Sequence, residues 1–205
     1  LHEFANYKVI DSAQKVERNQ FKKEAKPEDL MFFSFYPTKP VGSLDGGMIV
    51  SDDYEKIVYF KEAVLNGMSY ARDNWDRKIR FPGWKMYLNS FQAHIAAQNL
   101  NRLPRKLERL SEIREYYNKN LGCNNISSHL YRIKVDDNKK WQQKLRDKGI
   151  ITGIHYDASH LNSIYNGGKT FECPRSEEAA KTMLSIPFHE KLTSSQLEYI
   201  VEHVR

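Results

Sequence analysis

The chain has 205 residues, a formal net charge of +6 and 40% hydrophobic residues. This length and composition suit one large or two small globular domains and exclude a disordered chain. No apolar stretch is long enough to span a bilayer, so we expect no membrane segment, no leader peptide and a cytoplasmic protein. The basic residues alternate with acidic ones along the helical stretches, which favours solvated helix faces over nucleic-acid binding.

Three β-rich segments are predicted in the first quarter of the chain, at 7–11, 30–35 and 46–51. The residues before the first segment resemble the end of a helix. The second segment, LMFFSF, is almost wholly apolar, which is typical of a strand buried on both faces. A helix is predicted over 52–67, with acidic residues at its start and Gly67 as its stop.

The middle of the chain is predicted to be helical after an irregular stretch. Residues 68–85 lack periodicity, whereas apolar residues recur at helical intervals over 86–121. Pro104 interrupts this pattern and either kinks one long helix or begins a second one in its first turn.

Residues 122–205 alternate between strand and helix patterns and are predicted to form a small α+β domain. The expected strands are SSHLYRIKV, ITGIHY and SIPF, and the expected helices are NKKWQQKLRDKG, SEEAAKTML and TSSQLEYIVEHVR. A Ser-x-Glu capping pattern opens the second of these helices, and Thr193 begins the third. We therefore divide the chain into 1–85, a helical connector over 86–121, and 122–205.

Lys39 and Asp11 each follow or end a predicted strand, so both side chains can reach the carboxyl edge of one sheet. Open α/β proteins bind ligands at this edge. Pyridoxal phosphate (PLP) needs such a pair, because a lysine binds its aldehyde and a carboxylate keeps its pyridine nitrogen protonated. Ser34 could bind the phosphate, and Gln14 is a neutral hydrogen-bonding group nearby. The alternative for Lys39 is a solvated loop lysine.

The segments VIDSAQ and SFYPTKPVGSLDGG together resemble the DegT/DnrJ/EryC1/StrS family of sugar aminotransferases. The resemblance continues through PGWKMYLNSFQAHIAAQNLNRLPRKLERLSEIREYYNKNL, GIITGIHYDASH and LSIPFHEKLTSSQLEYIV. It implies an α/β PLP-dependent transferase of fold type I, with the C-terminal part of the large PLP-binding domain in 1–85 and the small domain in 122–205. Family members normally begin well before the segments seen here, so we expect this chain to be a C-terminal portion.

The family pattern implies a role for each matching residue around the cofactor. Lys39 would bind the PLP aldehyde and move the proton, and Asp11 would pair with the pyridine nitrogen. Gln14 would lie beside the ring and its 3-hydroxyl, and Ser34 would bind the phosphate.

Four further residues match family elements outside this cluster. Lys85, or Asn89 as its alternative, would reach the phosphate of the partner subunit's cofactor. His155 and Tyr156 would lie near the sugar nucleotide, although His155 could equally be a strand histidine with a satisfied hydrogen bond. His160 could pair with His155 on a metal, but no third ligand follows, so we expect no metal site.

The resemblance implies an aminotransferase that passes nitrogen from glutamate to a keto-deoxysugar nucleotide, in nucleotide-sugar and cell-surface polysaccharide biosynthesis. It also implies a homodimer with sites built across two subunits. The alternative is a catalytically incomplete member that acts as a binding or regulatory partner. Dehydratases of the family typically carry histidine in place of the lysine, so Lys39 argues against that activity.

Overall fold

The chain folds into two units, residues 1–104 and 105–205, and their boundary falls inside the long helix α3 (Ser90–Leu121). The computed structural model describes residues 2–4, 7–69, 77–169 and 171–205. Each unit is described below by itself, and the three-part division expected from the sequence stays a prediction. No helix within these described ranges is long and apolar enough to cross a membrane.

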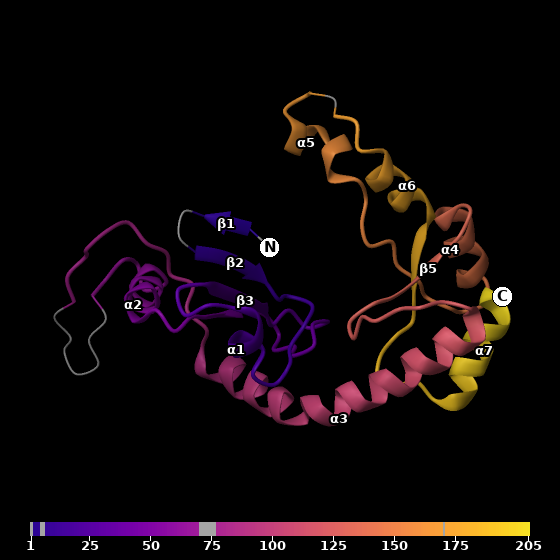
Figure 1. Cartoon of the computed structure of the whole chain (residues 1–205), viewed down its shortest axis with the longest axis horizontal. Helices are drawn as coiled ribbons and strands as arrows, with labels where there is room; N and C mark the ends of the chain where they lie inside the picture. Colours follow the sequence, from indigo (N-terminus) through magenta and orange to yellow (C-terminus); the bar gives the residue numbers. More distant parts are fainter. Residues whose placement is uncertain (1, 5–6, 70–76, 170) are drawn as a thin grey trace. The chain divides into compact units, whose positions relative to one another are not determined.

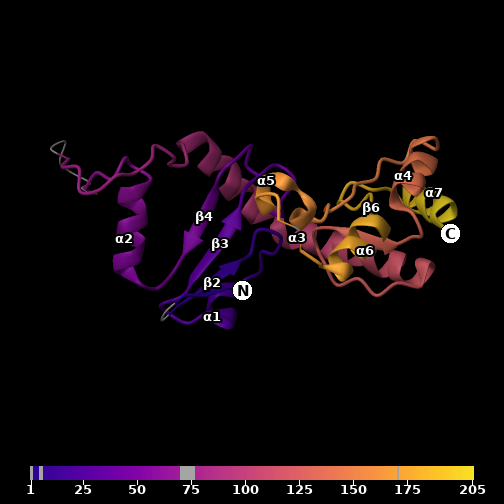
Figure 2. The same ribbon diagram turned by 90° about the horizontal axis from the view of Figure 1, so that it is seen from above.

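A four-stranded sheet forms the centre of the first unit (Figure 1). Its strands, in spatial order, are β1 (His2–Phe4), β2 (Tyr7–Asp11), β3 (Leu30–Ser34) and β4 (Gly47–Val50). The pair β2 and β3 is parallel, and the two outer pairs are antiparallel. Figure 2 shows β2, β3 and β4 side by side.

The three strands predicted in this unit are confirmed, but the helical interpretation of the first residues was wrong. His2–Phe4 pairs with Tyr7–Val9 as an antiparallel strand. Three residues are too few to display a helical or strand period. The backbone hydrogen bonds offered by β2 therefore decide the conformation of this segment.

Helices and loops of the first unit bury the apolar side chains of the sheet. Helix α1 (Gln20–Glu24), which the sequence did not reveal, lies between β2 and β3 in the chain, and α2 (Tyr54–Ala63) follows β4. The buried apolar side chains of this unit are Ile10, Leu30, Met31, Phe35, Val41, Ala63, Ala96 and Leu103. Helix α2 begins at Asp53, whose carboxylate accepts a hydrogen bond from the Lys56 N–H, as expected for a helix N-cap.

Asp29 is a buried carboxylate that holds the start of β2 against the turn before β3. Its two oxygens accept hydrogen bonds from the backbone N–H groups of Lys8 and Lys26, each at 2.8 Å. These backbone bonds hold the pKa of the Asp29 carboxyl below its ordinary value. The charged form of Asp29 is therefore favoured in the folded chain.

Helix α3 is continuous across Pro104, so one of the two expected alternatives, a single long helix, is confirmed. Its start is fixed by Asn89 and Gln92. The Asn89 side-chain oxygen accepts the Gln92 N–H at 2.9 Å, and the Gln92 side-chain oxygen accepts the Asn89 N–H at 3.4 Å. This reciprocal pair satisfies two backbone donors at the helix N-terminus.

The second unit is built around a two-stranded antiparallel sheet, β5 (Tyr131–Lys134) and β6 (Met183–Ile186). Its remaining elements are α4 (Asn138–Arg146), the short 3₁₀ helix η1 (Ser159–Leu161), α5 (Ser163–Asn166), α6 (Pro174–Thr182) and α7 (Ser194–Val204). Its buried core contains Ile113, Tyr117, Tyr131, Ile133, Leu145, Ile150, Leu184, Ile186, Leu192, Leu197, Ile200 and Val201. The predicted helices at α4 and α7 are confirmed, the latter with the Thr193–Gln196 capping box that its sequence indicates.

Three details of the second unit differ from the sequence prediction. The stretch ITGIHY is not a strand, because only Gly153 pairs, in an isolated bridge with Ser185. Helix α6 begins at Pro174 rather than at a Ser-x-Glu cap, since proline suits the first turn, where its missing N–H has no partner to lose. The last strand covers Met183–Ile186 and thus begins before the predicted SIPF stretch.

Candidate functional site

Asp11 and Ser34 lie at the same edge of the four-stranded sheet. The parallel strands β2 and β3 pair Asp11 with Phe32, so β3 reaches Ser34 two residues later at the same carboxyl edge. Asp11 is exposed, and its Oδ1 accepts a hydrogen bond from the Ala13 N–H at 2.9 Å. The Ser34 hydroxyl oxygen accepts the Tyr36 N–H at 3.3 Å. Parallel pairing alone thus brings a carboxylate and a hydroxyl to one edge.

Lys39 belongs to the loop 35–46, which we call the lysine loop and which leaves this edge of the sheet and returns as β4. Two backbone hydrogen bonds close its base, from Phe35 N to Gly46 O at 2.8 Å and from Ser43 N to Phe35 O at 2.7 Å. Inside the loop, Lys39 N donates to Tyr36 O at 2.9 Å, which forms a tight turn. The backbone of Lys39 is therefore fixed by main-chain bonds rather than by side-chain contacts.

Close packing holds the lysine loop onto its own unit. A Cβ placed on Gly42 would overlap the carbonyl oxygen of Pro37, so only glycine fits there. From α3, the Asn99 side-chain amide donates to Gly42 O at 2.6 Å, and the Ser43 hydroxyl donates to the Gln92 carbonyl oxygen. These contacts fix the backbone of the loop on the C-terminal side of Lys39, so the lysine lies in a constrained segment.

The amine of Lys39 has no hydrogen-bond or ion-pair partner among the residues that the structure describes, although the residue is half-buried. Gln14 is exposed in the turn that follows Asp11, at the same sheet edge. Asp11, Gln14, Ser34 and Lys39 thus lie on segments that begin or end at one edge of the sheet. This set of groups fits PLP, which needs a nucleophilic amine, an anionic partner for its ring nitrogen and hydrogen-bond donors for its phosphate.

Lys85 and Asn89 lie in the first unit, in the stretch that leads into helix α3. Lys85 is exposed and pairs with Leu65 in an isolated β-bridge, whereas Asn89 caps α3 through its side-chain oxygen. A Cβ on Gly46 would come 2.5 Å from Leu88 Cδ1, so Leu88 packs directly on the end of the loop. Gly46 has φ +106°, a conformation that favours glycine.

His155 and Tyr156 belong to the second unit. His155 Nδ1 lies 2.9 Å from the hydroxyl of Ser185, and Tyr156 is exposed with its ring edge-on to His155. His160 instead binds Glu177 of α6, at 3.1 Å. No cluster of three metal-binding side chains is found in the part of the chain that the structure describes.

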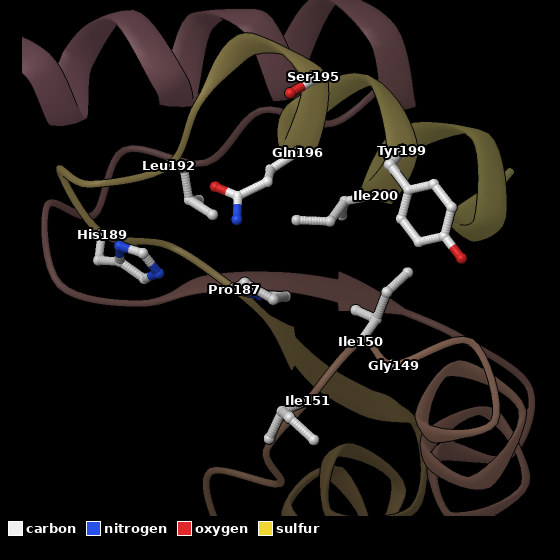
Figure 3. Close-up of a pocket in the computed structure, with 10 residues that line it drawn as sticks. All are labelled: Gly149, Ile150, Ile151, Pro187, His189, Leu192, Ser195, Gln196, Tyr199 and Ile200. Atoms are coloured by element: carbon white, nitrogen blue, oxygen red, sulfur yellow. The ribbon is translucent and has the colours of Figure 1, made fainter.

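A groove that the sequence did not indicate lies on the second unit, with a volume of about 680 Å³ (Figure 3). Its lining residues are Gly149, Ile150, Ile151, Pro187, His189, Leu192, Ser195, Gln196, Tyr199 and Ile200. Figure 3 shows the side chains of His189 and Gln196 directed into the space between α7 and Pro187. The lining is mainly aliphatic, and the Gln196 side-chain oxygen is already used to cap α7.

Sequence reasoning also missed the residues that position the site. Asn99 and Ser185 bind partners far away in the chain, Gly42 and His155, which no local pattern reveals. Gly42 offered one signal, since a glycine soon after the lysine indicates a place where backbones approach closely.

The mixed α/β fold, with strands that place a lysine loop at a sheet edge, matches portions of solved sugar aminotransferases. The sequence matches the DegT/DnrJ/EryC1/StrS aminotransferase family over residues 9–205, and the chain belongs to this family. The fold class and the resemblance expected from the sequence are thereby confirmed.

Similar proteins come from several bacteria. A spore coat polysaccharide biosynthesis protein, SpsC, of Bacillus subtilis is 27% identical and aligns with 86% of this chain and 53% of its own length. The aminotransferase TlmJ of Streptoalloteichus hindustanus is 28% identical, with a TM-score of 0.77 over 88% of this chain and 53% of that one. The apo-form of Spr1654 of Streptococcus pneumoniae, described as a sugar aminotransferase, is 24% identical. Its TM-score is 0.84, over 96% of this chain and 56% of that one.

The chain therefore spans about half the length of the relatives that it matches. Spr1654 has also been solved in its PLP-form. The comparisons thus show an aminotransferase fold and relatives in sugar and polysaccharide biosynthesis. The roles of individual residues in this chain stay predictions.

Proposed function

We propose that this chain carries the lysine-bearing part of a PLP-dependent aminotransferase that acts on a keto-deoxysugar nucleotide, with glutamate as the amino donor. The observation that carries the proposal is the common sheet edge of Asp11, Ser34 and Lys39, with the Lys39 amine lacking a partner among the described residues. Family membership and the sugar-related relatives support the same reaction class.

Each residue of the edge has a proposed task. Lys39 binds the cofactor aldehyde, Asp11 contacts the pyridine nitrogen, Gln14 lies by the ring and Ser34 binds the phosphate. PLP, when bound, supplies an electron sink for the breaking of the bond from carbon to hydrogen. Once the amino donor has freed the Lys39 Nζ atom from the cofactor aldehyde, this amine would take up that proton and return it, as a general base and then as a general acid.

The other predicted site residues lie far from Lys39 along the chain. His155 and Tyr156 are proposed to bind the sugar nucleotide. Lys85, with Asn89 as the alternative, is proposed to reach the cofactor phosphate of a second subunit, which makes the enzyme a homodimer. Light scattering after size-exclusion chromatography tests this arrangement, and a monomer at high concentration would contradict it.

Borohydride reduction in the presence of PLP tests the lysine directly. Reduction fixes PLP on the amine that it occupies, and peptide mass mapping then identifies the lysine. We expect preferential labelling of Lys39, with no label there in Lys39→Ala and unchanged labelling in Lys78→Ala, a control at an exposed lysine of the same unit. Equal labelling of Lys39 and Lys78 would contradict the proposal.

A half-reaction with glutamate separates the enzyme from a catalytically incomplete member. Absorbance measures the conversion of bound PLP to its amine form. We expect this conversion in the wild type, and its rate should be about 10²–10⁴-fold lower in Lys39→Ala, since a general base typically contributes that much. Labelling of Lys39 without any half-reaction would instead support a binding or regulatory role.

A further inference from the structure

The groove on the second unit combines buried hydrocarbon with exposed hydrogen-bonding groups. Its most buried lining residues are Ile150, Leu192 and Ile200, each at most 6% exposed. His189 and Gln196 line the same groove but are exposed, and Figure 3 shows both side chains directed into it. Its volume of about 680 Å³ lies within the range of small-molecule sites in proteins. The groove therefore has an apolar base and a polar edge.

The capping box of α7 decides which atom of the Gln196 amide faces the groove. Gln196 Oε1 accepts the Thr193 N–H at 3.0 Å, and the Gln196 backbone N–H donates to the Thr193 hydroxyl at 3.3 Å. Because the cap holds the oxygen, the Nε2 group is left on the other side, and Figure 3 shows it directed into the groove. Nε2 has no hydrogen-bond partner among the described residues. The amide thus presents a free donor.

His189 supplies a second donor at the same edge. Its imidazole has no partner in the described ranges of the chain, and an imidazole carries an N–H whether it is neutral or protonated. The other polar side chains of the lining are already engaged. The Tyr199 hydroxyl donates to Lys148 O at 3.1 Å, and the Ser195 hydroxyl lies 3.1 Å from that of Thr193. The two free polar groups of the lining are therefore both donors.

The charges of the groove favour an anionic acceptor over a cation. None of the ten described residues that line it carries a carboxylate, so a cationic ligand would find no partner there. Between His189 and Leu192 the chain carries Glu190 and Lys191, one charge of each sign. A carboxylate has two accepting oxygens, and its hydrogen bonds are stronger than those of a neutral carbonyl. Because both donors lie at the exposed edge, a carboxylate bound there keeps its contact with water.

We propose that this groove binds a monocarboxylate with a hydrocarbon body, of the chemical class of medium-chain fatty acids. The hydrocarbon packs on Ile150, Leu192 and Ile200, and the carboxylate accepts hydrogen bonds from Gln196 Nε2 and His189. Each methylene buried on the base should strengthen binding by up to about four-fold. The site lies within the second unit and does not rest on the proposed aminotransferase reaction.

Methyl NMR of the whole chain, with decanoate as the probe, locates the site. The Cδ1 methyl groups of isoleucine are labelled and assigned by single isoleucine-to-valine substitutions. We expect saturable shifts at Ile150, Ile151 and Ile200, which line the groove, and none at Ile126, which is 86% exposed in the same unit. Equal shifts at Ile126 would show adsorption of the hydrocarbon to any exposed apolar group and would overturn the proposal.

A ligand series in isothermal titration calorimetry tests the two parts of the ligand separately. Decanoate should bind more tightly than hexanoate, because its longer chain buries more hydrocarbon. Decylamine and decanol should bind at least about ten-fold more weakly than decanoate, since neither offers a charged acceptor to the two donors. Equal affinities of decanoate and decylamine would contradict the role of the donors, and equal affinities of decanoate and hexanoate would contradict the role of the apolar base.

Gln196→Glu separates the ligand contact from the helix cap. Glutamate keeps a side-chain oxygen for the Thr193 N–H, as capping boxes do, but puts a negatively charged oxygen where the donor was. Decanoate binding should weaken at least about ten-fold, while the thermal unfolding of the chain stays near that of the wild type. Gln98→Glu, the same change at an exposed position of α3, should bind decanoate like the wild type. Unchanged binding in Gln196→Glu would rule out the proposed contact.

A pair of variants at His189 and a dilution series complete the test. His189→Leu removes the second donor and should weaken decanoate binding about five-fold, whereas His189→Gln keeps a donor and should change it much less. Equal binding by these two variants would remove His189 from the site. In the absence of decanoate, the methyl signals of Ile150, Ile151 and Ile200 should not depend on protein concentration. Shifts there on raising the protein concentration alone would assign the groove to a second copy of the chain instead.

Discussion

The lysine loop in the first unit and the segment 154–173 in the second unit, of which the structure describes 154–169 and 171–173, both carry predicted site residues, but they are attached by different kinds of bonds. Main-chain hydrogen bonds close the lysine loop, and a glycine at Gly42 allows its two sides to touch. Side chains tie the described part of this segment to its unit, His155 to Ser185 and His160 to Glu177, while main-chain bonds such as Leu161 N to Ala158 O close short turns within it. Main-chain bonds do not titrate and survive most substitutions, so we expect the lysine loop to be the more robust of the two.

The exposure of apolar side chains also differs between the two segments, and it too favours a more robust lysine loop. The large apolar side chains exposed in the segment 154–173 are Tyr156, Leu161, Ile164, Tyr165 and Phe171. The lysine loop also exposes Tyr36 and Leu44, but it buries Phe35 and Val41, which are 6% and 2% exposed. A segment with few buried apolar groups opens at low cost in free energy, so the comparison predicts that single side-chain changes loosen 154–173 more readily.

The largest effect is expected where the lysine loop depends on the absence of a side chain. Gly42→Ala forces a methyl group against the Pro37 carbonyl oxygen and should lower the free energy of unfolding by about 1–3 kcal/mol. Because the loop must shift, PLP labelling of Lys39 should fall on the order of ten-fold or more. Denaturant titration and mass mapping measure the two effects.

Thr38→Ala is the matched control, since Thr38 is exposed next to Lys39 and should change neither quantity. If Gly42→Ala and Thr38→Ala had the same stability and the same PLP labelling of Lys39, the close packing of this loop would not be what positions the lysine.

A smaller, local effect is expected at Glu177. His160 donates to this carboxylate, and together with the Cys173 N–H and Lys181 it holds the pKa of Glu177 below its ordinary value of 4.5. The ionised form is thus stabilised in the folded state, so this contribution is present above pH 4.5 and is lost as the pH falls below it. Glu177→Gln should increase proteolytic cleavage within 156–169 several-fold at neutral pH.

The difference from wild type should disappear at acidic pH, where Glu177 is itself protonated. Glu178→Gln serves as the control, because Glu178 lies on the same helix but pairs with Lys134 in β5, at 2.6 Å. Increased cleavage of 156–169 in the control as well would assign the effect to α6 as a whole rather than to the His160 contact.

The smallest effect is expected for a side-chain bond to the lysine loop. Asn99→Ala removes one hydrogen bond to Gly42 O and should cost about 1 kcal/mol of stability, while Lys39 labelling stays near its wild-type level because the main-chain bonds persist. Gln98→Ala, at an exposed position of the same helix, should stay within about 0.5 kcal/mol of wild type. If Asn99→Ala, but not Gln98→Ala, lost the PLP label on Lys39, side-chain bonds rather than main-chain bonds would hold the lysine loop.

Local patterns predicted the elements that local interactions determine. The β3 strand was readable because its apolar composition is itself a local signal, and the start of α7 was readable at Thr193 because its capping partner Gln196 is only three residues away. The common sheet edge of Asp11 and Lys39 was also expected, since each follows a strand. The first two features needed no knowledge of distant contacts, whereas the common edge also requires β2 and β3 to pair in parallel.

Features that depend on distant partners could not be predicted in the same way. The stretch ITGIHY has strand-forming residues, yet only Gly153 pairs, and His155 leaves the ladder to bind Ser185 through its side chain. Likewise, Asn99 meets Gly42 only after β3, β4 and α3 have packed together. Tertiary packing overrides local propensity at such positions.

Pro104 gives the chain a natural point of dissection. Proline has no N–H, so the Leu100 carbonyl lacks the usual helical donor at the boundary between the two units. The proline ring also fixes φ near the helical value, which makes it the residue best suited to open a helix. A shortened gene that starts at Pro104 would therefore give the second half of α3 a favourable first turn. The second unit, which carries His155 and Tyr156, could then be studied as a separate module.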